Sequence, residues 1–240
     1  MLIAVIILIS IIQSIFGVGI LLFGTPLLLL LGYEFGFILS ILLPISLFVN
    51  LLQIVSNNNY KQIDYKILKN FIIYSLPFVV IFLLLILNYT SNVSLYVGLF
   101  LIIISLEKKN KVISHSLNWL IKSQKIYFML MGIIHGLTNL GGSLLALYFN
   151  KKYSDKYYIR TNIAFLYLLF ALFQIIILYM FNKNINTIEV KSLLYIFIGI
   201  IVYFIANKII FDKINFNIYT NIINYFLFLM GIIILIKNIV

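Results

Sequence analysis

The stretch Gly17-Val18-Gly19-Ile20-Leu21-Leu22-Phe23-Gly24-Thr25-Pro26 interrupts an apolar segment that would otherwise continue as one helix. A second interruption, Asn139-Leu140-Gly141-Gly142-Ser143, follows about half a chain later. Glycine leaves the backbone uncovered and Pro26 lacks a backbone donor, so both stretches predict helix breaks. At membrane depth, freed backbone groups persist only inside protein or beside a polar cavity. Paired breaks of this kind are typical of the substrate site of a transporter.

The composition requires a lipid environment. Of the 240 residues, 64% are hydrophobic and 10% are charged, whereas a soluble domain has about 25% charged residues. The net charge of +11 would favour a nucleic-acid partner in a soluble protein, but here the lysines lie in short loops beside apolar segments. We therefore expect the lipid bilayer, and no nucleic acid, as a partner. The absence of cysteine excludes disulfides and thiolate metal sites.

Apolar segments of about 20 residues, the length that spans a bilayer, divide the chain. We expect about eight, over residues 1–32, 35–56, 70–88, 91–106, 126–149, 161–181, 192–206 and 217–236. The predicted fold is an all-α polytopic membrane protein in two homologous halves, each with its first segment broken at a Gly-rich motif. The expected units are a first repeat over 1–106, a basic connecting loop over 107–125 and a second repeat over 126–240. The apolar N-terminus lacks the features of a cleaved signal peptide, so we expect it to be retained.

The two halves align through their breaks. Setting Gly17 against Asn139 gives an offset of 122 residues (139 − 17), close to half of the chain, and it places Gly19 on Gly141. Sequence identity between the halves is low, but the order of broken segment, unbroken span, polar loop and two shorter spans agrees. This order predicts an internal repeat.

The distribution of basic residues bears on how the broken segments sit in the membrane. If all eight segments cross, the basic residues divide 11 against 6 between the two sides. If each broken segment enters and returns on the same face, they divide 14 against 3, with Lys183, Lys191 and Lys237 in the minority. The positive-inside bias favours the second arrangement, which leaves three crossings per half and makes the repeats inverted. Lysines that capture substrate would also change this count, so the first arrangement stays open.

The acidic residues indicate which charge the pathway accepts. Each lies in or beside a loop: Glu34, Asp64, Glu107, Asp155, Glu189 and Asp212. A buried cation needs a carboxylate counter-charge, and the spans offer none. An anion can instead be held by backbone N–H groups at the N-terminus of a half-helix. The sequence therefore favours an anion, and it contains no catalytic motif, cofactor fingerprint or metal-spaced histidine pair.

The expected substrate-binding residues are those of the two breaks with their polar neighbours: Gly17, Gly19, Gly24, Thr25, Pro26, His135, Thr138, Asn139, Gly141, Gly142, Ser143 and Arg160. His135 could relay a proton, because its unperturbed pKa is about 6.5, or it could be a structural histidine bonded to a neighbouring carbonyl. Arg160, the sole arginine, could bind an oxyanion or only anchor the chain at the interface. Gly32, Gly36, Gly98, Gly199 and Gly231 are expected only to permit close helix packing.

At these residues the chain resembles the TauE/SafE family of bacterial membrane transporters, the sulfite exporter family. Members carry a duplicated motif similar to Gly-Ile-Gly-Gly-Gly, followed by an apolar run and Pro-Leu-Leu. The first copy here keeps Gly17, Gly19 and Pro26 but has Ile20 and Leu21 in place of glycines. The second copy keeps Gly141 and Gly142 and has Tyr148 where the proline would fall.

The resemblance implies a secondary transporter in the cell (inner) membrane that exports or exchanges a small anion such as sulfite, an organosulfonate or another small organic acid. It implies a site between the two broken segments near mid-membrane, alternating access around the bound anion, and no enzymatic activity or cofactor. A different class, a non-transporting scaffold or assembly subunit, would use the same glycines for packing alone. A polar cavity that reaches both breaks would favour transport, whereas dry contacts would favour packing. An exporter of amino acids would need a carboxylate in the spans.

Overall fold

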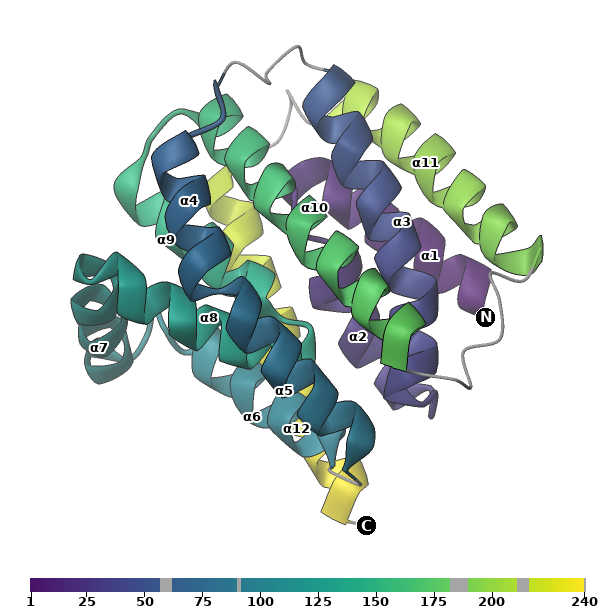
Figure 1. Cartoon of the computed structure of the whole chain (residues 1–240), viewed down its shortest axis with the longest axis horizontal. Helices are drawn as coiled ribbons and strands as arrows, with labels where there is room; N and C mark the ends of the chain where they lie inside the picture. Colours follow the sequence, from purple (N-terminus) through teal and green to yellow (C-terminus); the bar gives the residue numbers. More distant parts are fainter. Residues whose placement is uncertain (57–61, 90–91, 182–189, 211–215, 240) are drawn as a thin grey trace.

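A computed structural model describes residues 1–56, 62–89, 92–181, 190–210 and 216–239, and the regular elements in these ranges are α-helices (Figure 1). They are α1 (Leu2–Phe16), α2 (Ile20–Leu30), α3 (Phe35–Ser56), α4 (Tyr65–Tyr74), α5 (Leu76–Asn88), α6 (Val93–Ser105), α7 (Lys111–Lys122), α8 (Gln124–Thr138), α9 (Gly141–Lys152), α10 (Lys156–Phe181), α11 (Val190–Ile210) and α12 (Phe216–Ile239). The all-α prediction is confirmed for the described residues.

Four stretches among the described residues are long and apolar enough to cross a bilayer: Phe35–Val55, Tyr65–Asn88, Lys156–Phe181 and Ser192–Ile209. Shorter apolar helices cover Leu2–Ile15, Ile20–Leu30, Val93–Ser105 and Asn224–Asn238, within other segments expected from the sequence. The first and fifth expected segments are shorter because each is divided in two. α1 and α2 are separated at residues 17–19, and α8 and α9 at residues 139–140.

The chain reverses direction at both divisions, so that α1–α2 forms a first hairpin and α8–α9 a second hairpin. In the second, the Tyr127 hydroxyl donates to the Leu144 carbonyl at 2.8 Å, and the Tyr127 and Tyr148 rings lie 5.6 Å apart. A straight helix would separate those rings by about 30 Å. In the first, a Cβ placed on Gly24 would lie 3.1 Å from Cδ1 of Ile9. Both segments therefore fold back on themselves.

Pro26 does not mark the first break. It lies inside α2, and the helix continues past it to Leu30. The proline removes one backbone hydrogen bond, the one that would reach the carbonyl of Leu22, in a helix whose residues around it are buried. The break falls instead at Gly17, which has a left-handed backbone (φ 74°) that glycine adopts without strain.

Helices from opposite halves of the chain pack against one another. α3 lies along α10, α6 along α12, α1 along α11, and α5 along α8 (Figure 1). Gly98 and Gly231 allow the α6–α12 contact, because a Cβ on Gly231 would lie 2.9 Å from the Gly98 carbonyl oxygen. Gly199 packs against Ile45, so the expected packing role is confirmed for these three glycines. Gly32 differs: it is exposed, has φ 84°, and has open space around it.

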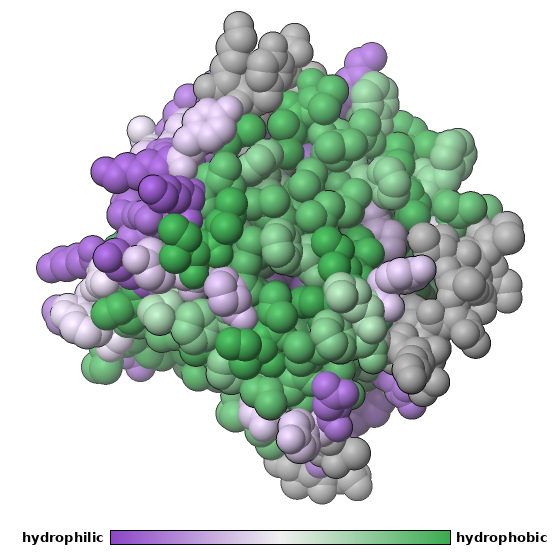
Figure 2. Space-filling model, viewed as in Figure 1, coloured by the Kyte–Doolittle hydropathy of each residue, from purple (hydrophilic) through white to green (hydrophobic). Residues whose placement is uncertain are grey.

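Three groups of basic residues belong to the majority side of the 14-against-3 division, and their segments lie together: Lys66 and Lys69, Lys108 to Lys125, and Lys151 to Arg160. The Tyr158 hydroxyl donates to Asp64, whose own N–H donates to Asn162, so the loop before α4 meets the start of α10. Lys151 at the end of α9 pairs with Glu107. Figure 2 shows hydrophilic residues gathered along the edge where α7 and α9 lie in Figure 1, while green apolar residues cover most of the remaining face. We call this region the basic end.

The segment expected as a basic connecting loop contains helix α7. The Asn110 side chain caps its N-terminus by accepting from the Val112 and Ile113 N–H groups. Ile121 is buried against the rest of the protein, while Trp119 is 62% exposed. α7 has 12 residues and is too short and too polar to be predicted as a membrane segment. Its packing against α8 shows which face points into the protein. A basic amphipathic helix with an exposed tryptophan is typical of a membrane–water interface.

Intrinsic fluorescence tests this placement, because Trp119 is the sole tryptophan in the sequence. We expect phospholipids brominated near the headgroup to quench the emission of the reconstituted protein, since an amphipathic indole favours the interface. A Trp119→Phe variant, which should lose the signal, is the control. Emission that brominated lipid leaves unchanged and aqueous iodide quenches fully would place α7 in water.

Candidate functional site

The turn of the first hairpin, which we call the first tip (residues 17–19), is held by one buried amide. Oε1 of Gln13 accepts hydrogen bonds from the backbone N–H groups of Gly19 and Ile20, the start of α2. Its Nε2 donates to Oδ1 of Asn50 at 3.1 Å and to Oε1 of Gln53 at 3.4 Å, both on α3. These three amide side chains are 0–1% exposed. The N-terminus of α2 is therefore capped from within the protein.

The turn of the second hairpin, the second tip (residues 139–140), is held in the same way by a histidine. Nδ1 of His135 accepts from the Gly141 N–H at 3.1 Å, and Nε2 lies 3.1 Å from Oε1 of Gln174 on α10. The ring stacks on Phe170 with 3.8 Å between centroids. His135 is fully buried. The structural alternative, a histidine bonded to a carbonyl of a neighbouring helix, fits this contact, because Oε1 of Gln174 is the carbonyl oxygen of an amide side chain on α10.

The two tips agree residue by residue at the offset of 122 expected from the sequence. Gly17 and Asn139 are both left-handed, with φ of 74° and 64°. The N–H of each bonds at 2.8 Å to the carbonyl four residues earlier, on Gln13 and His135. The capped amides, those of Gly19 and Gly141, are also 122 residues apart. The tips differ in the capping side chain: Gln13 is a neutral amide, whereas His135 is titratable.

These caps differ from the expected arrangement, in which exposed backbone N–H groups hold the anion. The N–H groups of Gly19 and Gly141 are already bonded to side chains, because a buried donor without a partner would be costly. All twelve predicted site residues are buried, and a Cβ on Gly142 would overlap the Tyr167 ring. The breaks are therefore closed to the surface of the protein in this conformation.

The two breaks also lie at different levels along α10 rather than face to face. Arg160 lies beside the first tip and Gln174 beside the second, and 14 residues of the continuous helix α10 (174 − 160) separate them, which is about 21 Å. The hairpins touch partway along, where Nδ2 of Asn139 donates to Oγ1 of Thr25 at 3.0 Å. The structure thus brings Thr25 and Asn139 together and keeps Gly17 and Gly19 apart from the second tip.

Thr138, Ser143 and Gly24, also predicted as site residues, make contacts that stabilise the hairpins. The Thr138 hydroxyl donates to the Ile134 carbonyl and accepts from the Leu140 N–H, and the Ser143 hydroxyl donates to the Leu140 carbonyl. A Cβ on Gly24 would lie 2.8 Å from the Leu42 side chain, so Gly24 permits α2 to pack on α3. These bonds and contacts are local, and they shape the hairpins rather than form a ligand cradle.

Arg160 is not an anchor at the water interface. It is 4% exposed, and its Nη2 donates to the Ser14 carbonyl at 2.7 Å, to the Tyr203 hydroxyl at 3.0 Å and to Oδ1 of Asn207 at 2.6 Å. Ser14 belongs to the last turn of α1, where helix carbonyls lack partners and the helix dipole is negative. The guanidinium therefore ties the end of α1 to α10 and α11.

Polar atoms without partners gather at the second tip. Nε2 of Gln174 and Oδ1 of Asn139 are buried without a hydrogen-bond partner, and the buried hydroxyl of Tyr167, whose oxygen faces the Gly142 N–H, has no acceptor for its proton. Tyr167 lies directly against Gly142 in the first turn of α9. At the first tip, by contrast, the Gln13, Asn50 and Gln53 amides bond to one another and to backbone groups. The second tip thus has spare hydrogen-bonding capacity.

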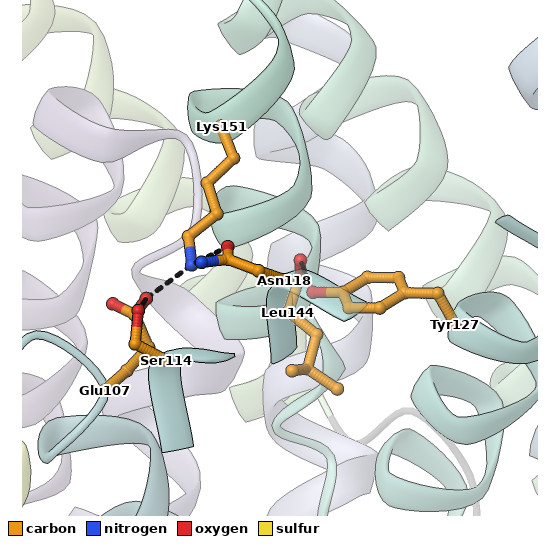
Figure 3. Close-up of polar contacts among 6 residues, drawn as sticks. All are labelled: Glu107, Ser114, Asn118, Tyr127, Leu144 and Lys151. Atoms are coloured by element: carbon orange, nitrogen blue, oxygen red, sulfur yellow. Dashed lines mark hydrogen bonds and ion pairs between the residues drawn. The ribbon is translucent and has the colours of Figure 1, made fainter. Parts of the chain in front are cut away.

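The open end of the second hairpin is fastened at the basic end (Figure 3). Nζ of Lys151 contacts Oε1 of Glu107 and donates to Oδ1 of Asn118 on α7 at 2.6 Å. Glu107 also accepts from the Ser114 hydroxyl at 3.4 Å. Glu107 is thus a buried carboxylate, but Lys151 already neutralises it.

A cavity of about 240 Å³ lies at the turn between α2 and α3 and includes Glu34 and Lys237 in its lining. It is at the end of the molecule opposite the basic end, where Nζ of Lys237 also donates to the Leu30 carbonyl. It reaches neither tip, so it is not the polar cavity expected between the breaks.

Sequence reasoning missed Gln13 and Tyr167. The repeat offset could have identified Gln13, because 13 + 122 is 135, the position of the histidine. No comparable signal marks Tyr167, one of 17 tyrosines in the sequence.

Comparison with known proteins agrees with this arrangement. The chain matches the family described as Sulfite exporter TauE/SafE over residues 2–235, which includes both hairpins and the four candidate membrane spans. The chain belongs to the TauE/SafE family. The resemblance noted in the sequence is thereby confirmed, and so is the expected class, a transmembrane protein of a transporter family. Neither curated proteins nor solved structures provide a match to this TauE/SafE chain.

Proposed function

We propose that this TauE/SafE protein is a secondary transporter that exports or exchanges a small anion, such as sulfite, an organosulfonate or another small organic acid, by alternating access. The observation that carries the proposal is the pair of hairpins that enter from opposite ends of the molecule. The first hairpin opens at the end that holds Lys237 and its tip points toward the basic end, while the second hairpin opens at the basic end and its tip points away from it. Opposed hairpins give each side of a membrane its own gate.

The pairing of helices supports an inverted repeat. In the exchange of halves, α1, α2, α3 and α6 correspond to α8, α9, α10 and α12, and α4 with α5 corresponds to α11. Under this exchange the α1–α11 contact becomes the α8–α5 contact, and the α3–α11 contact becomes the α10–α5 contact. The α3–α10 and α6–α12 contacts each exchange into themselves. Such a set of contacts fits two structurally equivalent halves, 1–106 and 126–240, that can rock against each other around α3 and α10.

The charges support an anion as the substrate and set the orientation. Among the described acidic residues, only Glu107 is buried, and Lys151 neutralises it, so no carboxylate remains for a cation. With the basic end in the cytoplasm, the positive-inside bias is satisfied. This orientation fits a multi-pass protein of the inner membrane whose two hairpins enter from opposite faces.

The capped tips bear on the alternative function, a non-transporting scaffold or assembly subunit. Buried, close-packed breaks whose amides are capped by side chains are what a packing role would show. They also fit the closed state that an alternating-access cycle passes through, in which neither side has a path to the site. Transport measurements separate the two functions.

The test is uptake of radiolabelled sulfite and of a radiolabelled short-chain sulfonate into proteoliposomes that contain the purified full chain. We expect wild-type vesicles to take up one of the probes well above the rate of empty vesicles. Asn139→Gly keeps the left-handed backbone, because Gly17 occupies the matching place, but it removes the bond to Thr25. Loss of that bond should slow uptake about tenfold.

Asn88→Gly, the same change at the exposed last residue of α5, is the control and should transport like the wild type. Folded wild-type protein that moves neither probe would contradict the transporter proposal and support the scaffold. Equal rates in Asn139→Gly and wild type would remove the contact between the hairpins from the mechanism.

A further inference from the structure

The hydrogen bonds of His135 fix where its ring carries a proton. The Gly141 N–H donates to Nδ1, so Nδ1 must be the bare, accepting nitrogen of a neutral imidazole. The ring proton then resides on Nε2, where it is donated to Oε1 of Gln174. The oxygen of Gln174 is thus held by the histidine, and its buried Nε2 has no partner.

A second proton on this ring has a single place to go, the lone pair of Nδ1. That nitrogen would then present an N–H to the N–H of Gly141, and two donors cannot share a hydrogen bond. Protonation therefore removes the cap from α9. It also puts a positive charge next to the N-terminus of that helix, which already carries the positive end of the helix dipole.

We propose that His135 is the proton site of the transport cycle and that its protonation opens an anion site at the second tip. The released Gly141 N–H supplies one donor. The unpartnered Nε2 of Gln174 and the hydroxyl proton of Tyr167, which has no acceptor, supply the others. Oδ1 of Asn139, also without a partner, accepts a hydroxyl or amino hydrogen of the solute. This inference rests on the proposed function and deepens it.

The ligand class is a small oxyanion that travels with one proton. The proton comes from water, binds Nδ1 and makes the ring an imidazolium of charge +1. The anion of charge −1 then balances that charge in a site with no other counter-ion. When the anion leaves on the other side, the proton leaves Nδ1 to water and the Gly141 cap reforms. Each cycle moves one proton and one anion in the same direction.

Among the described residues, no carboxylate lies beside the His135 ring, so the positive charge of the imidazolium is balanced by the anion. Tyr167 and Phe170 on α10 and Gly141 on α9 contact it, and Tyr167 is the titratable one among them. α5 and α6 carry no charged residue. The charged side chains on α8 itself and on α4, α7 and α9, which pack against it, are exposed, whereas His135 is fully buried: Lys66, Lys69, Lys111, Lys122, Lys125, Lys151 and Lys152, with His115 the remaining titratable imidazole. On α10, Lys156 is exposed, and the buried Arg160 lies 14 residues from Gln174, about 21 Å along the helix.

The first hairpin supplies the matched variant. Gln13 caps α2 with a neutral oxygen at the position equivalent to His135, so His135→Gln should keep the cap on α9 while removing the proton site. His115→Gln, the same change at the exposed second histidine on α7, is the control. Both variants should fold and elute as the wild type does.

The experiment measures accumulation of the labelled sulfonate in proteoliposomes with a pH gradient and no membrane potential. A sulfonate stays ionised, so any coupled proton must travel on the protein. One proton per anion should give about tenfold accumulation on the alkaline side per pH unit in the wild type and in His115→Gln. His135→Gln should equilibrate the probe without accumulating it, or lose uptake altogether.

Wild-type transport together with unchanged accumulation in His135→Gln would overturn this inference and leave the proposed function standing. Wild type that transports neither sulfite nor the sulfonate would overturn both. Independently of transport, nitrogen NMR of histidine-labelled His115→Gln protein should show His135 protonated on Nε2 alone at alkaline pH. It should also show the Gly141 amide shifting as the ring gains its second proton. An Nδ1–H tautomer, or an amide that does not respond, would overturn the switch.

Discussion

Gly19→Ala should abolish the fold of the first hairpin. The chain turns so sharply at the first tip that a Cβ at this position would overlap backbone atoms of Gln13 and Ile12. Backbone cannot rotate away as a side chain can, so the helices must separate and the Gln13 cap must break. We expect a cost near the upper end for overpacking, about 3 kcal/mol, seen as loss of monodisperse protein or a large fall in the unfolding temperature in detergent.

Gly32→Ala is the matched control for this change. Gly32 has a positive φ, which Gly19 does not, but a Cβ at Gly32 would meet nothing within 4 Å. Its replacement should cost only the backbone strain of about 1 kcal/mol. If Gly19→Ala unfolded at the wild-type temperature, the close turn between α1 and α2 would be wrong.

Arg160→Leu should have the second-largest effect. The change leaves the Ser14 carbonyl, the Tyr203 hydroxyl and the Asn207 amide oxygen without the donor they share. Buried acceptors that lose a charged donor cost about 3 kcal/mol together. The unfolding temperature in detergent should fall accordingly, and hydrogen exchange at the last turn of α1 should increase.

Two further variants serve as controls for the Arg160→Leu measurement. Arg160→Lys keeps the charge but not the planar fork, so it should recover part of the lost stability. Lys122→Leu removes an exposed cation at the end of α7 and should leave stability within about 0.5 kcal/mol of the wild type. Stability unchanged in Arg160→Leu would show that the guanidinium does not hold α1.

The breaks could be predicted from the sequence because their cause is local. Gly17 takes a left-handed backbone, and Asn139, one of the few other residue types that tolerate that conformation, takes it 122 positions later. The caps could not be predicted in the same way. Gln13 lies in an apolar run and resembles any single polar residue in a membrane helix, and its partners Asn50 and Gln53 come from a different helix.

Arg160 and Pro26 are two further residues whose place in the structure could not be predicted from the local sequence. Arg160 stands next to a lysine-rich turn, which is typical of an interface, but α1 and α11 close over it in the folded protein. Pro26 is the strongest helix breaker in the first motif, yet burial of the surrounding residues holds α2 together through it. In both cases tertiary packing outweighs the local preference, and a single sequence carries little information about that packing.

The contact between Lys151 and Glu107 determines how the second hairpin can move. It pins the base of α9 to the connector between the halves, so the base acts as a pivot and the tip as the free end of a lever. α9 has 12 residues and is about 18 Å long, so a tilt of about 10° at the pivot displaces the tip by about 3 Å. That displacement breaks a hydrogen bond to Gln174 or Thr25 without unfolding a single helical turn.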